Sequence, residues 1–341
     1  MHRVAICMSG GKDSSVAAYI LKHSGYEVFG ITMYTKELSH ACGSNIVEAA
    51  RRVAEYIGIP HHTVELTEEF KNRVIDYFAN EYINGRTPNP CAICNRELKF
   101  GLLWDKVREM GADYIATGHY ARIVEHNSEF YIREAKDLNK SQAYFLALLQ
   151  PSVLPHVIFP LGELTHAEVI DIARNAKLPV VERTSQDLCF VNGNYVEFLQ
   201  QHYNVELTPG DVIDYSGRKL GTHRGYLNYT VGQRKGLGIP AGSPLYVLKI
   251  DATNNRIVVG TRKHAYKKRI DVKLIVWRLK SKSVRVNVRI RYRHTAAPAN
   301  VVVDGSIAHV EFDTPQFAPT PGQLAAFYDG DIIVGGGIIE M

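Results

Sequence analysis

The sequence has few cysteines and no long apolar run, and these two features limit the classes of protein to which it can belong. Only five of its 341 residues are cysteine, at irregular spacing, which excludes a disulfide-framework protein. No run of about 18 apolar residues occurs, so we expect no membrane contact through a spanning helix. A charged-then-apolar leader is also missing, and we therefore expect a cytoplasmic protein. The composition, 45% hydrophobic and 22% charged, is typical of a globular chain with ample core.

Familiar phosphate-binding signatures are missing near the N-terminus. The stretch Ser9-Gly10-Gly11-Lys12-Asp13-Ser14-Ser15 fits neither G-x-x-x-x-G-K-[ST] nor G-x-G-x-x-G. It stands between an apolar run and a helical pattern, so it predicts a strand, a glycine turn and a helix N-terminus. Such a turn directs several backbone N–H groups at one point, which favours phosphate binding. The stretch resembles the SGGxDS loop of the PP-loop ATP pyrophosphatases, which cleave ATP to AMP and pyrophosphate and adenylate a substrate.

The net charge of +5 conceals an asymmetry along the chain. From Arg262 to Arg293 there are thirteen Lys and Arg residues against one acid, Asp271, so this block carries +12 and the remainder −7. A basic block on an otherwise acidic chain is typical of a surface that binds a polyanion. Composition alone also allows a solvated basic face.

Residues 1 to about 120 alternate short apolar strands with helical patterns. Strands are expected over residues 4–8, 26–31, 60–66 and 113–117, with helices over 45–57 and 68–82. This alternation predicts an α/β fold with a doubly wound parallel sheet, whose ligands lie at the carboxyl ends of the strands. The glycine loop, Met33 and Gly118-His119-Tyr120 all occupy such ends.

The chain changes character after Pro209-Gly210. Glycines multiply, helical patterns nearly vanish, and short strand patterns follow one another to the C-terminus. We expect domains over residues 1–205, 206–270 and 271–341, the last two mostly β. Neither internal repeats nor low-complexity segments are found.

A loop with two prolines leads to a pair of cysteines, Cys91 and Cys94. We expect a helix from Asn95 onward, which would place Cys94 at a helix N-terminus. The helix dipole and the cations nearby, Arg86, Arg96 and Lys99, would then lower the pKa of its thiol and make it a nucleophile. Cys7, in a strand, and Cys42, in a loop, are better read as structural thiols.

Nine motifs in order identify a family. They are Ser9–Ser15, Thr87–Pro90 with Cys94-Asn95, Thr117–Arg122, Ser185–Phe190, Gly221–Gly225, Tyr229–Gly238, Arg291–Arg293, Thr320–Gln323 and Gly335–Ile339. Together they resemble the tRNA-specific 2-thiouridylases (MnmA/TrmU) over nearly the whole chain. The resemblance implies an N-terminal PP-loop domain of the adenine nucleotide alpha hydrolase-like class, a small central domain and a C-terminal β-barrel. It also implies ATP-dependent 2-thiolation of the wobble uridine of tRNA.

The same resemblance assigns residues to ligands. ATP would be bound by Cys7, Met8, Ser9, Gly10, Gly11, Lys12, Asp13, Ser14, Met33 and Gly118. Cys94 matches the nucleophile and Cys189 the carrier of a persulfide, while Asn89, Pro90 and Cys91 would contact the target base. Other tRNA contacts would be His119, Lys140, Ser141, Gln142, Arg291, Tyr292 and Gln323. Mg²⁺ with ATP, the anticodon stem-loop, and a persulfide or sulfide donor such as a cysteine desulfurase relay complete the expected partners.

The residues read alone agree with this chemistry. A uridine carbonyl oxygen leaves poorly, and adenylation converts it into a phosphate oxygen of AMP, which leaves readily. One cysteine can then hold sulfur as a persulfide, while a second completes the transfer by forming a disulfide with the first.

The sequence departs from the family pattern at a few positions. Cys91 creates a C-x-x-C with Cys94, and with Cys189 it could instead hold a 4Fe–4S cluster. A structural zinc would need a fourth ligand from His119 or Cys42. Ser141 replaces the usual aspartate of a Lys-Asp-Gln-Ser type motif, and Lys12 replaces an apolar residue of the family loop.

Two other functions compete with thiolation. A nitrogen-transferring PP-loop ligase would need neither Cys94 nor Cys189. A non-catalytic RNA-binding protein would need no intact ATP loop. Variants of the two cysteines and tRNA-dependent turnover of ATP to AMP distinguish the three.

Overall fold

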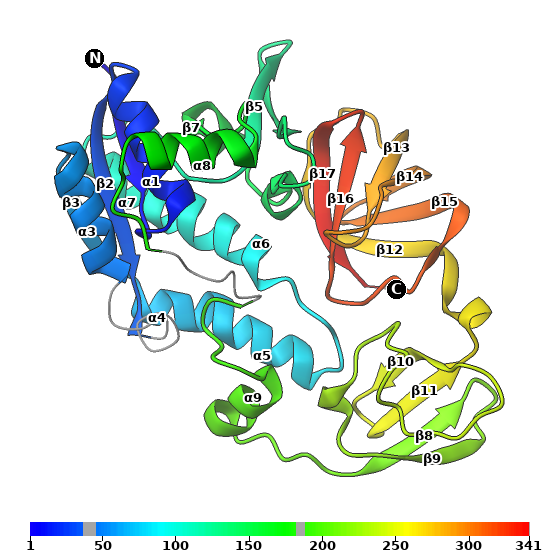
Figure 1. Cartoon of the computed structure of the whole chain (residues 1–341). Coiled ribbons are helices and arrows are strands. Elements are labelled where there is room, and N and C mark those ends of the chain that lie inside the picture. The colour runs from blue at the N-terminus through cyan, green and yellow to red at the C-terminus, as the bar shows by residue number, and fades with distance from the viewer. Residues whose placement is uncertain (37–45, 182–187, 341) are drawn as a thin grey trace. The chain divides into compact units, whose positions relative to one another are not determined.

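The computed structural model describes residues 1–36, 46–181 and 188–340, and the chain divides into two compact units (Figure 1). The first unit contains residues 1–74, 91–192 and 331–334. The second contains residues 75–90, 193–330 and 335 to the C-terminus. Both units therefore combine segments that are distant in the sequence.

A parallel sheet forms the centre of the first unit. Its strand order is β3-β2-β1-β4-β7, with β1 (Arg3–Cys7), β2 (Glu27–Tyr34), β3 (His61–Glu65), β4 (Tyr114–Ala116) and β7 (Val157–Ile158). The middle strand is β1, because Val4 lies opposite Val28 on one side and Tyr114 on the other. The expected parallel α/β sheet is confirmed, and its four expected strands are all present.

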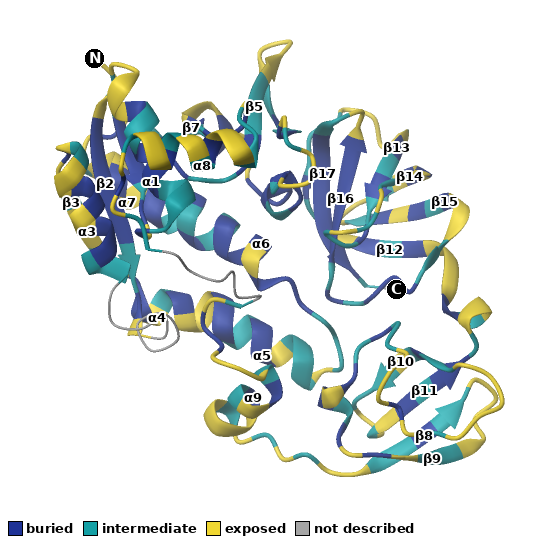
Figure 2. Ribbon diagram, in the orientation of Figure 1, coloured by how far each residue is buried: buried dark blue, intermediate teal, exposed yellow. Residues whose placement is uncertain are grey.

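Three helices cover one face of this sheet. Helices α1 (Lys12–His23), α3 (Ile46–Ile57) and α8 (His166–Asn175) contribute Leu21, Val53 and Val169 to a core cluster with Val4 and Ile6 of β1. Side chains two residues apart on a strand share a face, which is why Val4 and Ile6 enter the same cluster. The interior appears as dark blue ribbon in Figure 2. The expected capping box of Thr165 and Glu168 at the start of α8 is also confirmed.

The helices that follow β3 differ from the prediction. The segment expected as one helix is α4 (Thr67–Phe70), a π-helical turn (Lys71–Ile75) and α5 (Asp76–Ile83). After a loop, α6 (Pro90–Cys94) runs into a second π-helix (Asn95–Leu102) and α7 (Leu103–Glu109). Proline suits the first position of a helix, where no N–H partner is needed, so the helix begins at Pro90, five residues earlier than expected.

Short elements complete the first unit. They are β5 (Ala121–His126), β6 (Glu129–Glu134) and two 3₁₀ helices, Ala143–Leu146 and Pro151–His156. The β5–β6 hairpin turns at Asn127 and Ser128, which both have positive φ. The start of β17 (Ile332–Ile339) pairs with β6.

The second unit contains α5, α9 (Tyr195–Tyr203) and two β sheets. The smaller sheet has the order β10-β11-β8-β9, with β8 (Gly210–Asp214), β9 (Lys219–His223), β10 (Tyr246–Asp251) and β11 (Arg256–Gly260). Val212, Val247 and Ile257 form its core. Two 3₁₀ helices, Tyr226–Asn228 and Arg262–Ala265, flank these strands.

The larger sheet closes into an antiparallel barrel of six strands. The order is β12-β15-β14-β13-β16-β17, and β12 also pairs with β17. Their bounds are β12 (Tyr266–Trp277), β13 (Ser283–Arg289), β14 (Ala297–Asp304), β15 (Ile307–Phe317), β16 (Leu324–Asp329) and β17. A Cβ at Gly335 would lie 2.8 Å from the Trp277 ring, so glycine lets these two strands close the barrel. Within the described residues, no helix is both long and apolar enough to cross a membrane.

Candidate functional site

The glycine loop lies between β1 and α1, at the carboxyl end of the central strand. Gly10 has a φ of +70°, and a Cβ there would lie 2.4 Å from the Ala49 Cβ, so both conformation and packing require glycine. Gly11 is the N-cap of α1 and makes no side-chain cap hydrogen bond. The N–H groups of the first turn have no intrahelical partners, and they suit an anionic ligand.

Hydroxyl groups brace this loop from within. The Ser14 Oγ donates to the Gly11 carbonyl at 3.0 Å and accepts from the Ser9 N–H at 3.2 Å. The buried Ser15 Oγ donates to the same carbonyl at 2.8 Å. On the strand side, burial raises the pKa of the Cys7 thiol to about 12, so Cys7 stays protonated near neutral pH. The loop is thus preformed.

The segment after β4 packs directly on the glycine loop. A Cβ at Gly118 would lie 2.8 Å from the backbone C of Asp13 and N of Ser14. Two residues later, the Tyr120 hydroxyl donates to the Asp13 Oδ1 at 3.1 Å. Burial, followed by the nearby Asp13 carboxylate, raises the pKa of Tyr120, so the phenol remains a donor. Gly118 and Asp13, both predicted to bind ATP, are therefore in contact, whereas Met33 lies near the carboxyl end of the neighbouring strand β2.

Cys94 is the last residue of α6, and only 8% of it is exposed. Burial raises the pKa of its thiol to about 11, and the charge of Lys99 offsets this only in part. The prediction of a lowered pKa is wrong for two reasons. Cys94 does not stand at a helix N-terminus, and desolvation of the thiolate outweighs the cation.

A continuous set of hydrogen bonds joins the Cys94 helix to the glycine loop. Next to Cys94, the Asn95 Nδ2 donates to the Phe145 carbonyl at 3.1 Å. Phe145 belongs to the 3₁₀ helix that follows Gln142, whose Oε1 accepts from the Tyr120 N–H at 3.1 Å. Tyr120 in turn contacts Asp13. Sequence reasoning gave no role to Asn95 or Tyr120, although both lie within quoted motifs.

His119 and Ser141, both predicted to contact tRNA, are half-buried and buried, respectively, rather than exposed to a ligand. The His119 Nδ1 lies 2.7 Å from the Thr117 Oγ1, and burial with the nearby Lys99 lowers the pKa of the imidazole. Ser141 is 3% exposed and accepts from the Ala135 N–H at 3.2 Å. Lys140, by contrast, is exposed.

The remaining thiols differ in exposure. Cys91 and Cys189 are exposed, whereas Cys94 is buried. Among the described residues, no group of three or more His, Cys, Asp or Glu side chains could hold a metal ion. In this part of the chain, Cys91, Cys94 and Cys189 are therefore not gathered into one group of metal ligands. Cys42, named for the zinc alternative, and residues 185–187 of the Ser185–Phe190 motif lie outside the described residues.

In the second unit, the loop before Cys91 is bound by two residues from the C-terminal part of the chain, Gln323 and Glu340. The Gln323 Nε2 donates to the carbonyls of Thr87 at 2.9 Å and Pro88 at 3.2 Å. Arg86 pairs with Glu81 at 2.8 Å and with Glu340 at 2.9 Å. Gln323 and residues 87–88, all in motifs quoted for the family, are thus brought together, whereas Asn89 itself is buried.

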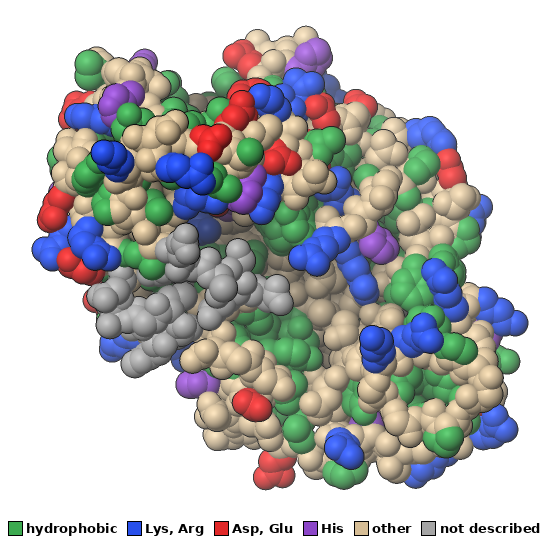
Figure 3. All heavy atoms as spheres, viewed as in Figure 1, with side chains coloured by type: hydrophobic (Ala, Val, Ile, Leu, Met, Phe, Trp, Pro, Cys, Tyr) green, Lys and Arg blue, Asp and Glu red, His purple; other side chains and the backbone are tan. Residues whose placement is uncertain are grey.

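The basic block is only partly open to a ligand. Arg285 pairs with Asp313, and Glu311 accepts from both Lys268 and Arg269 at 3.1 Å. The Arg291 Nη2 donates to the carbonyls of Val231 and Ala318 and to the Thr320 hydroxyl. Tyr292 follows Arg291 and is half-buried. Many Lys and Arg side chains still reach the surface seen in Figure 3.

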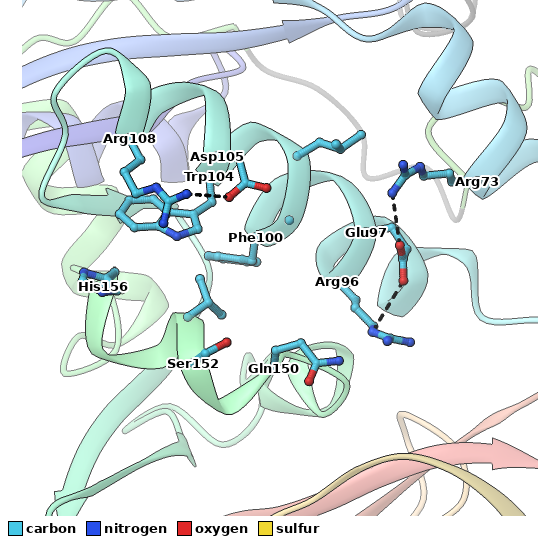
Figure 4. Close-up of a pocket in the computed structure, with 13 residues that line it drawn as sticks. Arg73, Arg96, Glu97, Phe100, Trp104, Asp105, Arg108, Gln150, Ser152 and His156 are labelled. Atoms are coloured by element: carbon cyan, nitrogen blue, oxygen red, sulfur yellow. Dashed lines mark hydrogen bonds and ion pairs between the residues drawn. The ribbon is translucent and has the colours of Figure 1, made fainter. Parts of the chain in front are cut away.

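A separate groove of about 390 Å³ lies beside the second π-helix in the first unit (Figure 4). On one side the Glu97 carboxylate lies between Arg73, at 3.4 Å, and Arg96, at 3.5 Å. On the other the Trp104 ring stacks on His156 with 5.0 Å between centroids. None of the site residues expected from the sequence lines this groove.

Three protein-family models match successive parts of the chain. They are described as the tRNA methyl transferase HUP domain, over residues 2–193, the tRNA methyl transferase PRC-barrel domain, over 196–261, and the aminomethyltransferase beta-barrel domain, over 267–339. These matches agree with the parallel sheet, the smaller β sheet and the six-stranded barrel, and they confirm the expected fold class.

Curated relatives match over nearly the full length. The tRNA-specific 2-thiouridylase MnmA of Clostridium acetobutylicum is 42% identical over 352 residues, which cover 99% of both chains. MnmA 1 of Syntrophus aciditrophicus is 44% identical over 345 residues, covering 99% of this chain and 92% of its own. MnmA of Halothermothrix orenii is 44% identical over 356 residues, covering 100% and 99%.

Proposed function

The chain belongs to the MnmA family of tRNA-specific 2-thiouridylases, and from this premise we propose that it replaces the 2-oxygen of the wobble uridine of tRNA by sulfur, at the expense of ATP. The observation that carries the proposal is the connection within the first unit between the glycine loop and Cys94. Hydrogen bonds through Tyr120, Gln142 and Phe145 join the preformed anion site to Asn95, the residue next to the buried Cys94.

The first step is adenylation of the uridine. ATP lies in the glycine loop, with its phosphates on the N–H groups at the start of α1, and Cys7–Ser14, Met33 and Gly118 surround it. The uridine 2-oxygen attacks the α-phosphate and pyrophosphate leaves. Mg²⁺ would accompany ATP and neutralise phosphate charge. The tight fit of Gly118 on Asp13 and Ser14 supports a loop that is rigid before ATP arrives.

Sulfur transfer then uses two cysteines. The terminal sulfur of a Cys189 persulfide attacks C2 of the uridine, and AMP leaves with the former carbonyl oxygen. The Cys94 thiolate attacks the Cys189 Sγ, so the S–S bond to the transferred sulfur breaks and a Cys94–Cys189 disulfide forms. 2-Thiouridine is released, and an external reductant supplies two electrons to restore both thiols. A persulfide or sulfide donor, such as a cysteine desulfurase relay, reloads Cys189.

The burial of Cys94 determines the order of these reaction steps. With a thiol pKa of about 11, Cys94 stays protonated in the absence of substrate and does not attack the persulfide prematurely. Its proton must leave during sulfur transfer, and the nearby Lys99 charge favours the thiolate at that moment.

Contacts with the anticodon stem-loop are proposed for two sets of residues. In the first unit they are Cys91, His119, Lys140, Ser141 and Gln142, and in the second they are Asn89, Pro90, Arg291, Tyr292 and Gln323. Gln323 and Arg291 act in part by shaping backbone, because their side chains already bind main-chain carbonyls. We also retain the division into domains 1–205, 206–270 and 271–341, and a cytoplasmic location, where tRNA is found.

The experiment that tests this function follows labelled ATP. Incubation with unmodified tRNA should release AMP and pyrophosphate, and substitution of the wobble uridine should abolish that release. Turnover that ignores tRNA but depends on an amine donor would favour a nitrogen-transferring ligase. ATP that is neither bound nor turned over, with tRNA bound normally, would favour an RNA-binding protein without catalysis.

A further inference from the structure

The Lys12 ammonium is held by a histidine from a distant helix. Lys12 is the first residue of α1, and its Nζ lies 2.9 Å from the Nε2 of His166, the first residue of α8. The contact joins residues 154 positions apart and is partly buried. Lys12 stands within the glycine loop that is expected to bind ATP, so the contact links this loop to the start of α8.

His166 is itself fixed in position. Its backbone N–H donates to the Asp137 Oδ2 at 3.1 Å, and its ring meets the Tyr120 ring edge-on at 6.4 Å between centroids. The capping box of Thr165 and Glu168 anchors the helix turn that carries it. The imidazole therefore has little freedom to follow a moving lysine, and the lysine is the partner that becomes ordered.

The surroundings decide the protonation state of the imidazole. The charged groups that face it are Lys12 and Asp13 of α1, and Asp137 and Lys140 of the loop after β6. Burial, followed by the two lysines, lowers the pKa of His166, and the two aspartates oppose this only in part. At neutral pH the ring is thus uncharged, and its Nε2 accepts a hydrogen bond from Lys12 while Nδ1 carries the proton.

We propose that His166 is a positioning residue for Lys12, holding the ammonium beside the glycine loop so that it meets the phosphates of ATP without first being ordered. The inference rests on the proposed function, because it takes ATP as the ligand of the loop. A lysine side chain has four rotatable bonds, and immobilising it on binding costs affinity. A neutral acceptor fixes the ammonium without cancelling its charge, which a carboxylate partner would do.

Two substitutions separate this role from a structural one. His166→Ala should raise the Kd for ATP by roughly two- to tenfold, the cost of ordering one long side chain, and leave kcat at saturating ATP unchanged. His166→Gln should restore the affinity, because its amide oxygen can accept from Lys12. In a Lys12→Met background, His166→Ala should have no further effect. His23→Ala, at the other end of α1, is the matched control.

The pH profile adds a second readout. Wild-type affinity for ATP should fall, relative to His166→Gln, as the pH drops below the ordinary imidazole pKa of 6.5, because a protonated imidazole repels Lys12. Affinity that rises instead would mean that the imidazolium binds phosphate directly, and the proposal would be overturned. Equal Kd values for wild type and His166→Ala would overturn it too. So would a His166→Ala substitution that raises the Kd for ATP as much in the Lys12→Met background as in the wild type. A wild-type protein that binds no ATP at all would refute the proposed function itself.

Discussion

Replacing Gly118 by alanine should weaken ATP binding, because no space exists for even one methyl group. The added Cβ would lie 2.8 Å from the Asp13 C and the Ser14 N and 3.0 Å from the Asp13 carbonyl oxygen. All three are backbone atoms at the start of α1, so no side chain can rotate away. To regain an ordinary contact of 3.4 Å, the helix start must retreat by roughly 0.6 Å.

The magnitude follows from the cost of overpacking. Forcing an extra methyl group into a packed site costs about 1–3 kcal/mol. If this cost appears in the free energy of ATP binding, the Kd for ATP rises roughly 5- to 150-fold. Equilibrium dialysis with labelled ATP measures this change, and a thermal unfolding curve detects any loss of global stability.

Gly242→Ala is the matched control, because a Cβ at that position meets no atom within 4 Å and the φ is not positive. It should leave both Kd and melting temperature unchanged. An unaltered Kd in Gly118→Ala would refute the reasoning that this segment sets the geometry of the loop.

Three further predictions concern thiols and charge. Iodoacetamide should alkylate exposed Cys91 before buried Cys94 at pH 7. The rate of Cys94 alkylation should rise about tenfold per pH unit as the pH approaches the thiol pKa of about 11. Equal alkylation rates of the two thiols at pH 7, measured by peptide mapping, would contradict the burial of Cys94. Arg291→Ala should lower the free energy of unfolding in urea by about 1–3 kcal/mol, because the buried Val231 carbonyl and the Thr320 hydroxyl lose the charged donor that binds them. Exposed Arg293→Ala should leave this free energy unchanged, and it should weaken tRNA binding and reduce the salt dependence of that binding. Protein purified anaerobically should contain no stoichiometric iron or acid-labile sulfide, and an active, iron-loaded protein would refute the two-thiol account.

The local patterns of the sequence were sufficient for the parallel sheet and the glycine loop. Strand, glycine turn and helix follow one another without a gap, so no distant contact was needed to place residues 4–21. The sequence analysis does not predict the β5–β6 hairpin. Asn127 is a sequence signal for it, because asparagine tolerates the positive φ that its turn position adopts. Helix α6 begins earlier than predicted, because the sequence pattern places the proline at its first position in the preceding loop.

What the sequence could not reveal are pairings across long separations. Burial of Cys94 reverses the expected direction of its pKa, and burial depends on elements that pack around it from elsewhere in the chain. Gln323 binds the Thr87 carbonyl across 236 residues, and Lys12 meets His166 across 154. Motif order identifies such residues as a set but does not state which of them touch.

The most direct test of the account is nucleoside mass spectrometry of unmodified tRNA after incubation with this protein, ATP, Mg²⁺ and a persulfide or sulfide donor. We expect 2-thiouridine at the wobble position, and we expect it to be lost in Cys94→Ser and in Cys189→Ser. The absence of thiolated product from protein that binds ATP, or its persistence in both Cys94→Ser and Cys189→Ser, would contradict the account.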